Sequence, residues 1–334
     1  MDLLLDFLLR VLTQFQSPSL AFLIGGILVA AAGSKLQIPD AIYQFAVFML
    51  LMRIGLNGGM EIRESDFSTI ILPALAAIAL GLVIVLIGWV SLARLPGIAR
   101  ADAIATAGLF GAVSASTLGA AMVVLEAEEI FYEAWVPALY PFMDIPALVL
   151  AIVLAGMAKA DGKEQREVVS VGHIITDSLR GSALSALILG LLLGLFTRPE
   201  RVFDTFYDPL FRGLLSVLML TMGMEAWARL AELRRVAHWY VVYAAAAPLV
   251  HGGIAFAIGY GLHVLTGFSP GGVVLLALLA ASSSDISGPP TLRAAIPEAN
   301  PSAYIGSSTS VGTPIAIGIC IPLFVALAQI VFGV

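Results

Sequence analysis

The amino-acid sequence predicts an all-α polytopic membrane protein with ten transmembrane helices, arranged as two inverted five-helix repeats with broken helices in spans 4 and 9. Of its 334 residues, 60% are hydrophobic and only 12% are charged, whereas soluble domains carry about 25% charged residues. The mean hydropathy is +0.98. Apolar windows approaching the roughly 20 residues that a bilayer-spanning helix needs recur along the chain. A third observation is that landmarks of the first half return at a fixed distance in the second half.

The spans follow from the apolar windows between polar or Pro/Gly punctuation. They are expected, in order, at residues 19–33, 42–56, 70–92, 103–125, 135–158, 179–196, 211–227, 239–265, 272–295 and 303–331. The second span is expected to end in a turn at Asn57-Gly58-Gly59. Cys320 lies in the last apolar run and is expected to be a packing residue, because free thiols are usually buried.

The repeat is indicated by residue pairs that all share the separation of Ser114 and Ser282, which is 282 − 114 = 168 residues. The other pairs are Gly55 with Gly223, Ser116 with Ser284, and Pro146 with Pro314. Each unit then holds five spans, and an odd number forces the second unit to enter the membrane from the opposite side. We therefore expect a first repeat at residues 1–158, a cytoplasmic linker at 159–176 and a second repeat at 177–334.

The orientation is predicted from the basic residues of short loops. The side with more of them, expected to be cytoplasmic, carries Lys35, Arg94, Arg100, Lys159, Lys163, Arg166, Arg180, Arg229, Arg234, Arg235 and Arg293. The opposite side carries Arg10, Arg53, Arg63, Arg198, Arg201 and Arg212. Both termini and the acidic loop at 126–133 are then expected outside. The N-terminal segment lacks the basic region of a cleavable signal, so no cleavage is expected.

The ninth span contains the segment SSSDISGPPT at residues 282–291. Pro289 and Pro290 lack backbone N–H groups and obstruct a continuous helix, and Ser287 is a suitable N-cap before them. We therefore expect a broken helix. A break at bilayer depth strands backbone N–H and C=O groups, each of which costs several kcal/mol when unsatisfied in hydrocarbon. Polar groups or a ligand must satisfy them.

The equivalent segment of the fourth span is GAVSASTLG at residues 111–119, which has glycines at both ends and three hydroxyls. A softer break is expected here. If the repeats are inverted, two half-helix N-termini point toward a common place near the midplane, where their N–H groups favour an anion.

Asp285 is a carboxylate inside the membrane, which costs about 2.5 to 3.5 kcal/mol on the mildest scale, and no basic residue is near it in sequence. Carboxylate, hydroxyl and carbonyl oxygens are hard ligands for hard cations. The sequence therefore predicts sodium bound by Asp285, with further oxygens from Ser282, Ser116, Thr117 and Asp144. A cation held there would offset the charge of the anion, so that the two bind together.

Several of these residues have a second interpretation. Any single serine of the two segments would also be explained by a hydrogen bond to its own or a neighbouring helix. Asp144 would be either a cation ligand or a cap of the helix beyond Pro141. His251 would relay a proton or, as we favour, make an interhelical hydrogen bond. Glu225 and Arg229 are expected on a solvated interfacial face, together with the charges at 232–235.

Other functions are excluded by what the sequence lacks. It has no Gly-rich phosphate loop, HExxH, Cys/His cluster or Gly-x-Ser-x-Gly elbow, so we expect no enzyme and no cofactor beyond Na⁺ as a coupling ion. The net charge of −6 comes without a basic patch, which argues against nucleic acid as a partner.

The sequence resembles the SbtA-type sodium-dependent bicarbonate transporters. The matching segments are SPSLAFLIGG at 17–26, GLFGAVS at 108–114, ALYPFMDIP at 138–146, YDPLFRG at 207–213 and SSSDISGPPTL at 282–292. The resemblance implies ten spans, a core domain that moves against a gate domain, a homotrimer, and location in the bacterial inner membrane. It further implies bicarbonate held by Phe110, Gly111, Ala112, Ser114, Ser283 and Ser284, with sodium on Asp285.

Similar proteins are inhibited by a trimeric PII-like regulator, SbtB, which docks on the cytoplasmic face. The mid-chain loop of this sequence is shorter than the loop of the family, so loop-mediated regulation is less expected than docking elsewhere. The predicted function is sodium-dependent bicarbonate import by alternating access. Two alternatives are a symporter for another small anion, and a receptor or channel that binds the anion without sodium.

Overall fold

The computed structural model describes residues 18–64, 67–160, 176, 180, 182–233 and 238–334, and among these every regular element is a helix. Within these ranges, seven helical segments are long and apolar enough to cross a membrane: Asp40–Glu64, Thr69–Leu92, Arg100–Ala127, Val136–Ala158, Glu200–Ala228, Trp239–Thr266 and Pro301–Phe332. Three shorter apolar helices, Ala21–Ala31, Ser185–Phe196 and Pro270–Ala281, lie at the first, sixth and ninth predicted spans. The prediction of an all-helical, multi-pass membrane protein is confirmed.

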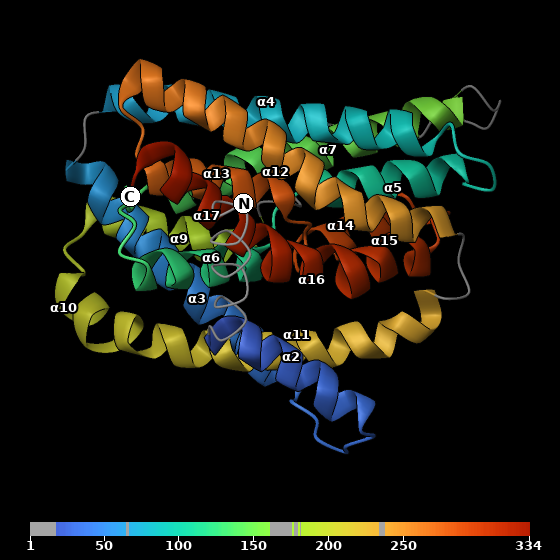
Figure 1. Cartoon of the computed structure of the whole chain (residues 1–334), viewed down its shortest axis with the longest axis horizontal. Helices are drawn as coiled ribbons and strands as arrows, with labels where there is room; N and C mark the ends of the chain where they lie inside the picture. The colour runs from blue at the N-terminus through green and yellow to red at the C-terminus, as the bar shows by residue number, and fades with distance from the viewer. Residues whose placement is uncertain (1–17, 65–66, 161–175, 177–179, 181, 234–237) are drawn as a thin grey trace, which may run out of the picture.

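The helices follow one another without a strand in the described ranges (Figure 1). In the first half they are α2 (Pro18–Ala31), α3 (Asp40–Glu64), α4 (Phe67–Leu92), α5 (Arg100–Gly111), α6 (Ala115–Ala127), the short η1 (Val136–Leu139) and α7 (Tyr140–Ala160). In the second half they are α9 (Ser182–Phe196), α10 (Glu200–Val202), the π-helical η2 (Phe203–Tyr207), α11 (Asp208–Leu233), α12 (His238–Thr266), α13 (Pro270–Ala281) and α14 (Gly288–Ala295). The last span consists of α15 (Pro301–Ser307), the π-helical η3 (Ser308–Gly312), α16 (Thr313–Ile315), the π-helical η4 (Ala316–Cys320) and α17 (Ile321–Phe332).

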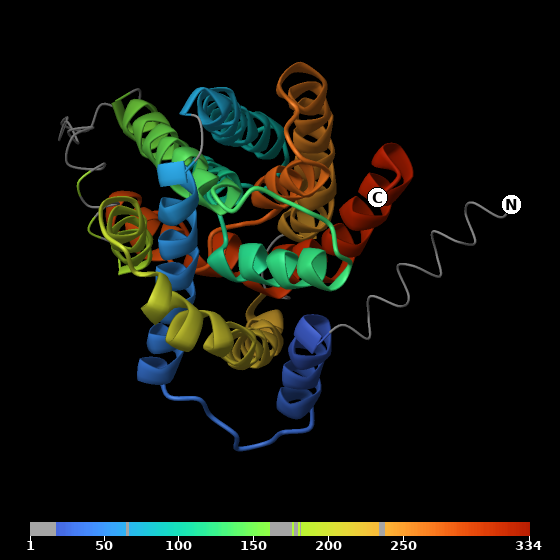
Figure 2. The ribbon, with the colours of Figure 1, turned by 90° about the vertical axis from the view of Figure 1, so that its left-hand side faces the viewer.

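The helices form two groups by their packing. In the four-helix group, α3 packs along α9, α2 packs along α11, and α3 and α11 touch. The crossing group comprises α4 to α7 and α12 to α17, in which α4, α5 and α7 pack together and α12 packs along α13. Figures 1 and 2 both place α2 beside α11 and away from α4 and α12. The helix breaks therefore all belong to one group, and the other group flanks it.

Glycines set the close approach of the helices in the four-helix group. A Cβ atom at Gly26 of α2 would lie 2.1 Å from the Leu220 carbonyl oxygen, and one at Gly223 of α11 would lie 2.1 Å from the Leu23 carbonyl oxygen. Gly55 and Gly194 allow a similarly close approach of α3 and α9. A Cβ atom added at either glycine would lie 2.3 Å from a carbonyl oxygen of the facing helix. Small residues that let backbones touch are the usual means of packing helices in lipid, where no hydrophobic force acts between them.

The predicted turn at Asn57-Gly58-Gly59 is wrong, because these residues lie inside α3. The physical reason is again close packing. A Cβ atom at Gly59 would come within 2.2 Å of the Leu191 carbonyl oxygen of α9. Gly59 allows α9 to pack closely against α3 and does not interrupt the helix, so α3 continues to Glu64. Cys320 is fully buried in the main hydrophobic core, as expected of a packing residue.

The predicted linker at 159–176 falls almost wholly outside the described residues, as do residues 1–17 and the charges at 234–235. The other predicted spans agree with the observed helices to within a few residues, with two exceptions. Helix α3 continues to Glu64, eight residues past its predicted end (64 − 56 = 8), and α11 continues to Leu233, six residues past its predicted end (233 − 227 = 6).

Gly223→Ala should destabilise the protein by about 1–3 kcal/mol, because the added methyl group overpacks the α2–α11 crossing. Gly213→Ala is the matched control, since it lies in the same helix and has no atom within 4 Å of the added Cβ. We expect that control to be neutral or slightly stabilising, because alanine favours helix over glycine by roughly 1 kcal/mol. The measurement is thermal unfolding in detergent. Equal effects of the two substitutions would contradict the packing role.

Candidate functional site

The site is built on the two helix breaks, which occur where the sequence predicts them. Helix α5 ends at Gly111 and α6 begins at Ala115, with extended backbone at Ala112 and Ser114. Helix α13 ends at Ala281, with extended backbone at Ser282, and α14 begins at Gly288. Two extended segments thus face one another inside the crossing group.

Hydrogen bonds join the two breaks directly. The Ser284 backbone N–H donates to the Leu109 carbonyl oxygen over 2.9 Å. The Ser114 backbone N–H donates to Ser282 Oγ over 3.0 Å, which links two residues that the predicted repeat makes equivalent. Backbone groups stranded by one break are therefore satisfied by the other, as they must be away from water.

The carboxylate of Asp285 has two oxygens in different situations. Its Oδ2 accepts hydrogen bonds from the Ser114 hydroxyl, over 3.0 Å, and from the Ser116 hydroxyl. Its Oδ1 is buried and has no hydrogen-bond partner among the described residues. The hydroxyl of Thr117 is likewise buried and without a partner there. One carboxylate oxygen holds the first break, and the other remains available to a ligand.

Asp144 also connects the breaks. Its side chain is fully buried, and Oδ1 accepts a hydrogen bond of 2.9 Å from the Val113 backbone N–H. The Ser287 hydroxyl donates to Oδ2 over 3.2 Å. Asp144 lies inside α7, so the interpretation that it caps the helix beyond Pro141 is wrong. It serves instead as an acceptor for the other two segments, because a buried carboxylate satisfies several donors at once.

The N-terminus of α14 is capped differently from the prediction. Ser287 occupies the N-cap position but makes no side-chain cap. Ser284 Oγ accepts the hydrogen bond from the Gly288 backbone N–H over 2.8 Å, while the Ser287 hydroxyl turns to Asp144. A hydrogen bond to a charged acceptor is roughly twice as strong as a neutral one, which accounts for the exchange of roles.

The residues expected to hold the anion are brought together and buried. Phe110 lies in the last turn of α5, and its ring packs edge-on against the ring of Tyr243, with the two centroids 5.2 Å apart. Ser283 Oγ lies 2.7 Å from Ser308 Oγ. Gly111 and Ala112 are packed at the break, where a Cβ atom on Gly111 would lie 2.5 Å from Val85. Each of the three site hydroxyls is hydrogen-bonded to another residue: Ser283 to Ser308, Ser284 to Ser287, and Ser114 to Asp285.

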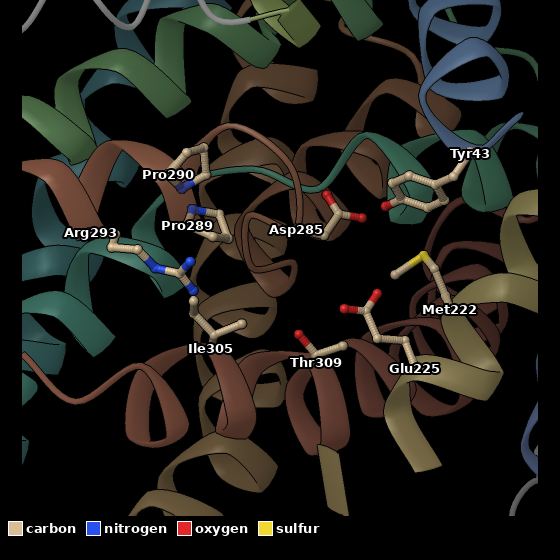
Figure 3. A pocket seen from close by; sticks show the side chains of 9 residues that line it. All are labelled: Tyr43, Met222, Glu225, Asp285, Pro289, Pro290, Arg293, Ile305 and Thr309. Carbon is tan, nitrogen blue, oxygen red and sulfur yellow. The ribbon is translucent and has the colours of Figure 1, made fainter. Parts of the chain in front are cut away.

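A cavity of about 160 Å³ adjoins the second break (Figure 3). Its lining consists of Tyr43, Met222, Glu225, Asp285, Pro289, Pro290, Arg293, Ile305 and Thr309. Of the predicted ligands only Asp285 is among them. Glu225, expected on a solvated face, is partly exposed and borders this cavity, and Met222, three residues before it, turns the same side of α11 toward the cavity. Sequence spacing gives no sign that Tyr43 and Glu225 approach Asp285.

His251 in α12 is 1% exposed, with its ring 6.2 Å from that of Tyr243. Its Nδ1 has no hydrogen-bond partner within the described chain, so the expected interhelical hydrogen bond is not formed at that nitrogen.

A buried arginine lies near the middle of α3, ten residues after Tyr43 (53 − 43 = 10). Arg53 is 6% exposed, and its Nη2 lies 2.6 Å from Asp208 Oδ1 of α11 and 3.5 Å from Glu126 Oε1 of α6. Its guanidinium lies over the Phe211 ring, 4.2 Å from the centroid. A charge in this environment requires such partners, and these partners tie α3 and α11 to the crossing group.

Glu126 receives two more groups at this place, which we call the outer charge cluster (Arg53, Glu126, Asp208 and Arg212). Arg212 Nη2 lies 3.5 Å from Glu126 Oε2, and the Tyr132 hydroxyl donates to Oε1 over 3.3 Å. Burial, and then the charge of Glu126, raise the pKa of Tyr132, so its hydroxyl stays protonated and able to donate. From the helical rise, the cluster is about 15 Å from Tyr43 along α3 and about 25 Å from Glu225 along α11. The outer charge cluster is therefore separated from the cavity along both α3 and α11.

The model of a family described as the Na⁺-dependent bicarbonate transporter superfamily matches residues 18–329. No curated protein matches the chain.

Asp144→Ala should destabilise the protein more than Asp144→Asn. Alanine leaves the Val113 N–H and the Ser287 hydroxyl without their acceptor, at about 1–3 kcal/mol for each unsatisfied buried group, whereas asparagine keeps one carbonyl oxygen for Val113. Thermal unfolding in potassium buffer measures this difference. Equal destabilisation by both substitutions would show that the charge of Asp144, and not its hydrogen bonds, matters to the fold.

Proposed function

The chain belongs to the Na⁺-dependent bicarbonate transporter superfamily, and on that premise we propose that it imports bicarbonate together with sodium across the bacterial inner membrane by alternating access. The observation that carries the proposal is the placement of Asp285. Asp285 contacts the first break through Oδ2 and also borders the cavity at the second break.

The cation is proposed to bind at Asp285 Oδ1. That oxygen is buried without a partner in the described structure, and an unpaired carboxylate oxygen inside a membrane is costly unless a cation occupies its vicinity. Oxygens from Ser116, Thr117, Ser282 and Asp144 surround the same crossing and are of the hard type that sodium prefers. The Thr117 hydroxyl, also unpartnered, is a ready further ligand.

Bicarbonate is proposed to bind between the breaks, held by donors from Ser114, Ser283 and Ser284 and by the backbone at Phe110, Gly111 and Ala112. The start of α6 supplies favourable partial charge. The hydroxyls of Ser283 and Ser308 are hydrogen-bonded to each other, and they are proposed to turn toward the anion. Sodium at Asp285 neutralises the carboxylate, which otherwise repels an anion so close. This is the physical basis of coupling.

Alternating access is supported by the difference between the two ends of the four-helix group. The outer charge cluster closes the side predicted to face outward, and the cavity beside Asp285 lies on the side that carries Arg293, predicted to face the cytoplasm. We propose that this is an inward-facing state. The glycine-packed four-helix group is proposed as the static scaffold, and the crossing group as the part that carries both ligands.

Ten spans in two inverted five-helix repeats remain part of the proposal. It is supported by the glycine crossings, because Gly26 and Gly194 are separated by 168 residues, as are Gly55 and Gly223 (194 − 26 = 168; 223 − 55 = 168). Thus α2 on α11 and α9 on α3 are equivalent contacts. The homotrimer, the docking of SbtB and the external position of both termini rest on the resemblance and the loop charges.

The direct test is uptake of labelled bicarbonate into proteoliposomes with an inward sodium gradient, with potassium in place of sodium, and with the variant Asp285→Asn. We expect wild-type uptake to require sodium. The variant should lose this sodium-dependent uptake, because asparagine keeps the shape of the side chain but removes the charge that binds the cation. Asp204→Asn, which changes an exposed carboxylate away from the breaks, is the control and should transport normally.

Uptake without sodium would favour a channel or receptor over a symporter. Competition by other small monovalent anions, measured in the same vesicles, decides whether the substrate is bicarbonate or a different anion.

Arg53→Ala should weaken the outer closure and shift the protein away from the inward-facing state. A cysteine placed in the cavity by Thr309→Cys, in a Cys320→Ala background, reports the state through its reaction with a membrane-impermeant maleimide. We expect labelling from the inner side to fall severalfold with Arg53→Ala, because Asp208 and Glu126 lose the buried guanidinium that pairs with both of them. Arg63→Ala is the matched control, since Arg63 pairs with Glu200 over 2.6 Å near the end of the same helix. An equal change in both variants would argue against a gating role of Arg53.

A further inference from the structure

The cavity at the second break brings a second carboxylate, that of Glu225, to face Asp285. Figure 3 shows the Glu225 carboxylate pointing into the cavity from α11, and the Tyr43 hydroxyl pointing toward Asp285 from α3. The hydroxyl of Thr309, in the π-helical segment η3, faces the same space. Four oxygen-bearing side chains therefore border a cavity of about 160 Å³, which is large enough for a partly hydrated cation.

The two carboxylate oxygens of Asp285 differ in their hydrogen bonding. Oδ2 is occupied by the Ser114 and Ser116 hydroxyls. Oδ1 is buried and has no hydrogen-bond partner in the ranges that the structure describes. A cation bound at Oδ1 would therefore have the break on one side and the cavity, with Glu225 across it, on the other. Carboxylate and hydroxyl oxygens are the ligands that a hard cation requires.

The residues that border the cavity come from both helix groups. Asp285 and Thr309 belong to the crossing group, whereas Tyr43 and Glu225 belong to the four-helix group. A displacement of one group against the other changes the separation of the two carboxylates. The Glu225 carboxylate therefore attracts a cation at Asp285 while this cavity is open. The attraction weakens in a state in which the second break has moved away from α11.

The cavity also separates charges of opposite sign. Arg293 of α14 borders it beyond Pro289 and Pro290, on the side away from Glu225 and Tyr43 (Figure 3). A cation leaving Asp285 is therefore drawn toward α11, and is repelled by the guanidinium on the other side.

We propose that Glu225 is a positioning residue for the transported cation: its carboxylate, facing Asp285 across the cavity, attracts sodium on the inner side of the site and sets the sodium affinity of transport. The inference rests on the proposed sodium symport. It assigns a role to a residue outside the helix breaks, and it places the path of the cation along α11.

The experiment measures bicarbonate uptake into proteoliposomes as a function of sodium concentration, and the binding of labelled sodium to the purified protein. We expect Glu225→Gln to raise the half-saturating sodium concentration about tenfold, because one of two nearby negative charges is lost. Uptake at saturating sodium, and the thermal unfolding midpoint in potassium buffer, should stay at the wild-type level. Glu225→Asp should restore most of the affinity. Glu61→Gln changes a partly buried glutamate of the same helix group that does not border the cavity, and it should leave the sodium dependence unchanged.

Each outcome bears on one of the two proposals. If wild-type uptake depends on sodium but Glu225→Gln has the wild-type half-saturating concentration, the role of Glu225 is refuted and the symport stands. If Glu225→Gln lowers uptake equally at every sodium concentration and lowers the unfolding midpoint in potassium, Glu225 is structural and the inference is also refuted. If wild-type protein neither binds sodium nor requires it for uptake, the proposed symport fails, and the inference fails with it.

Discussion

The hydrogen bonds that join the two helix breaks are the interaction on which the rest of the structure depends. Interrupting a helix inside a membrane exposes backbone groups that hydrocarbon cannot satisfy. Here Ser284 N–H is satisfied by Leu109 and Ser114 N–H by Ser282, each break completing the other. Asp144 adds an acceptor for Val113. The consequence is a polar region, inside helices long enough to cross a membrane, whose backbone groups are satisfied without water.

We propose that Asp285 makes that polar region a site for ions. Its Oδ2 accepts hydrogen bonds from Ser114 and Ser116, whereas Oδ1, like the Thr117 hydroxyl, has no partner within the described ranges. In this proposal a cation satisfies Oδ1 and neutralises the carboxylate, so that an anion can bind beside it. The glycine crossings of α2 on α11 and α3 on α9 supply a rigid neighbour against which such a site can move. In the proposed mechanism, Asp285 serves both coupling and movement, because this one side chain contacts the first break and borders the cavity.

Much of this could be predicted from local sequence, and the rest could not for physical reasons. The Gly-Pro-Pro run forces the second break, and an acid without a basic neighbour indicates a bound cation, so both features are readable along one segment. Glu225 and Tyr43 lie far from Asp285 in the chain, and only the packing of α11 and α3 brings them to it. The turn expected at Asn57-Gly58-Gly59 failed because glycine serves close helix packing as well as turns. Ser284, not Ser287, caps α14 because a buried carboxylate, Asp144, takes the Ser287 hydroxyl.

Sodium at Asp285 is proposed to strengthen binding of the anion, because it neutralises the carboxylate that would otherwise repel it. Calorimetric titration of bicarbonate into the purified protein, at a series of sodium concentrations with potassium holding the ionic strength constant, tests it most directly. The account predicts that the Kd of bicarbonate falls as sodium rises, and that bicarbonate lowers the Kd of sodium by the same factor, as linkage requires. A bicarbonate Kd that is the same in sodium and in potassium would contradict the account.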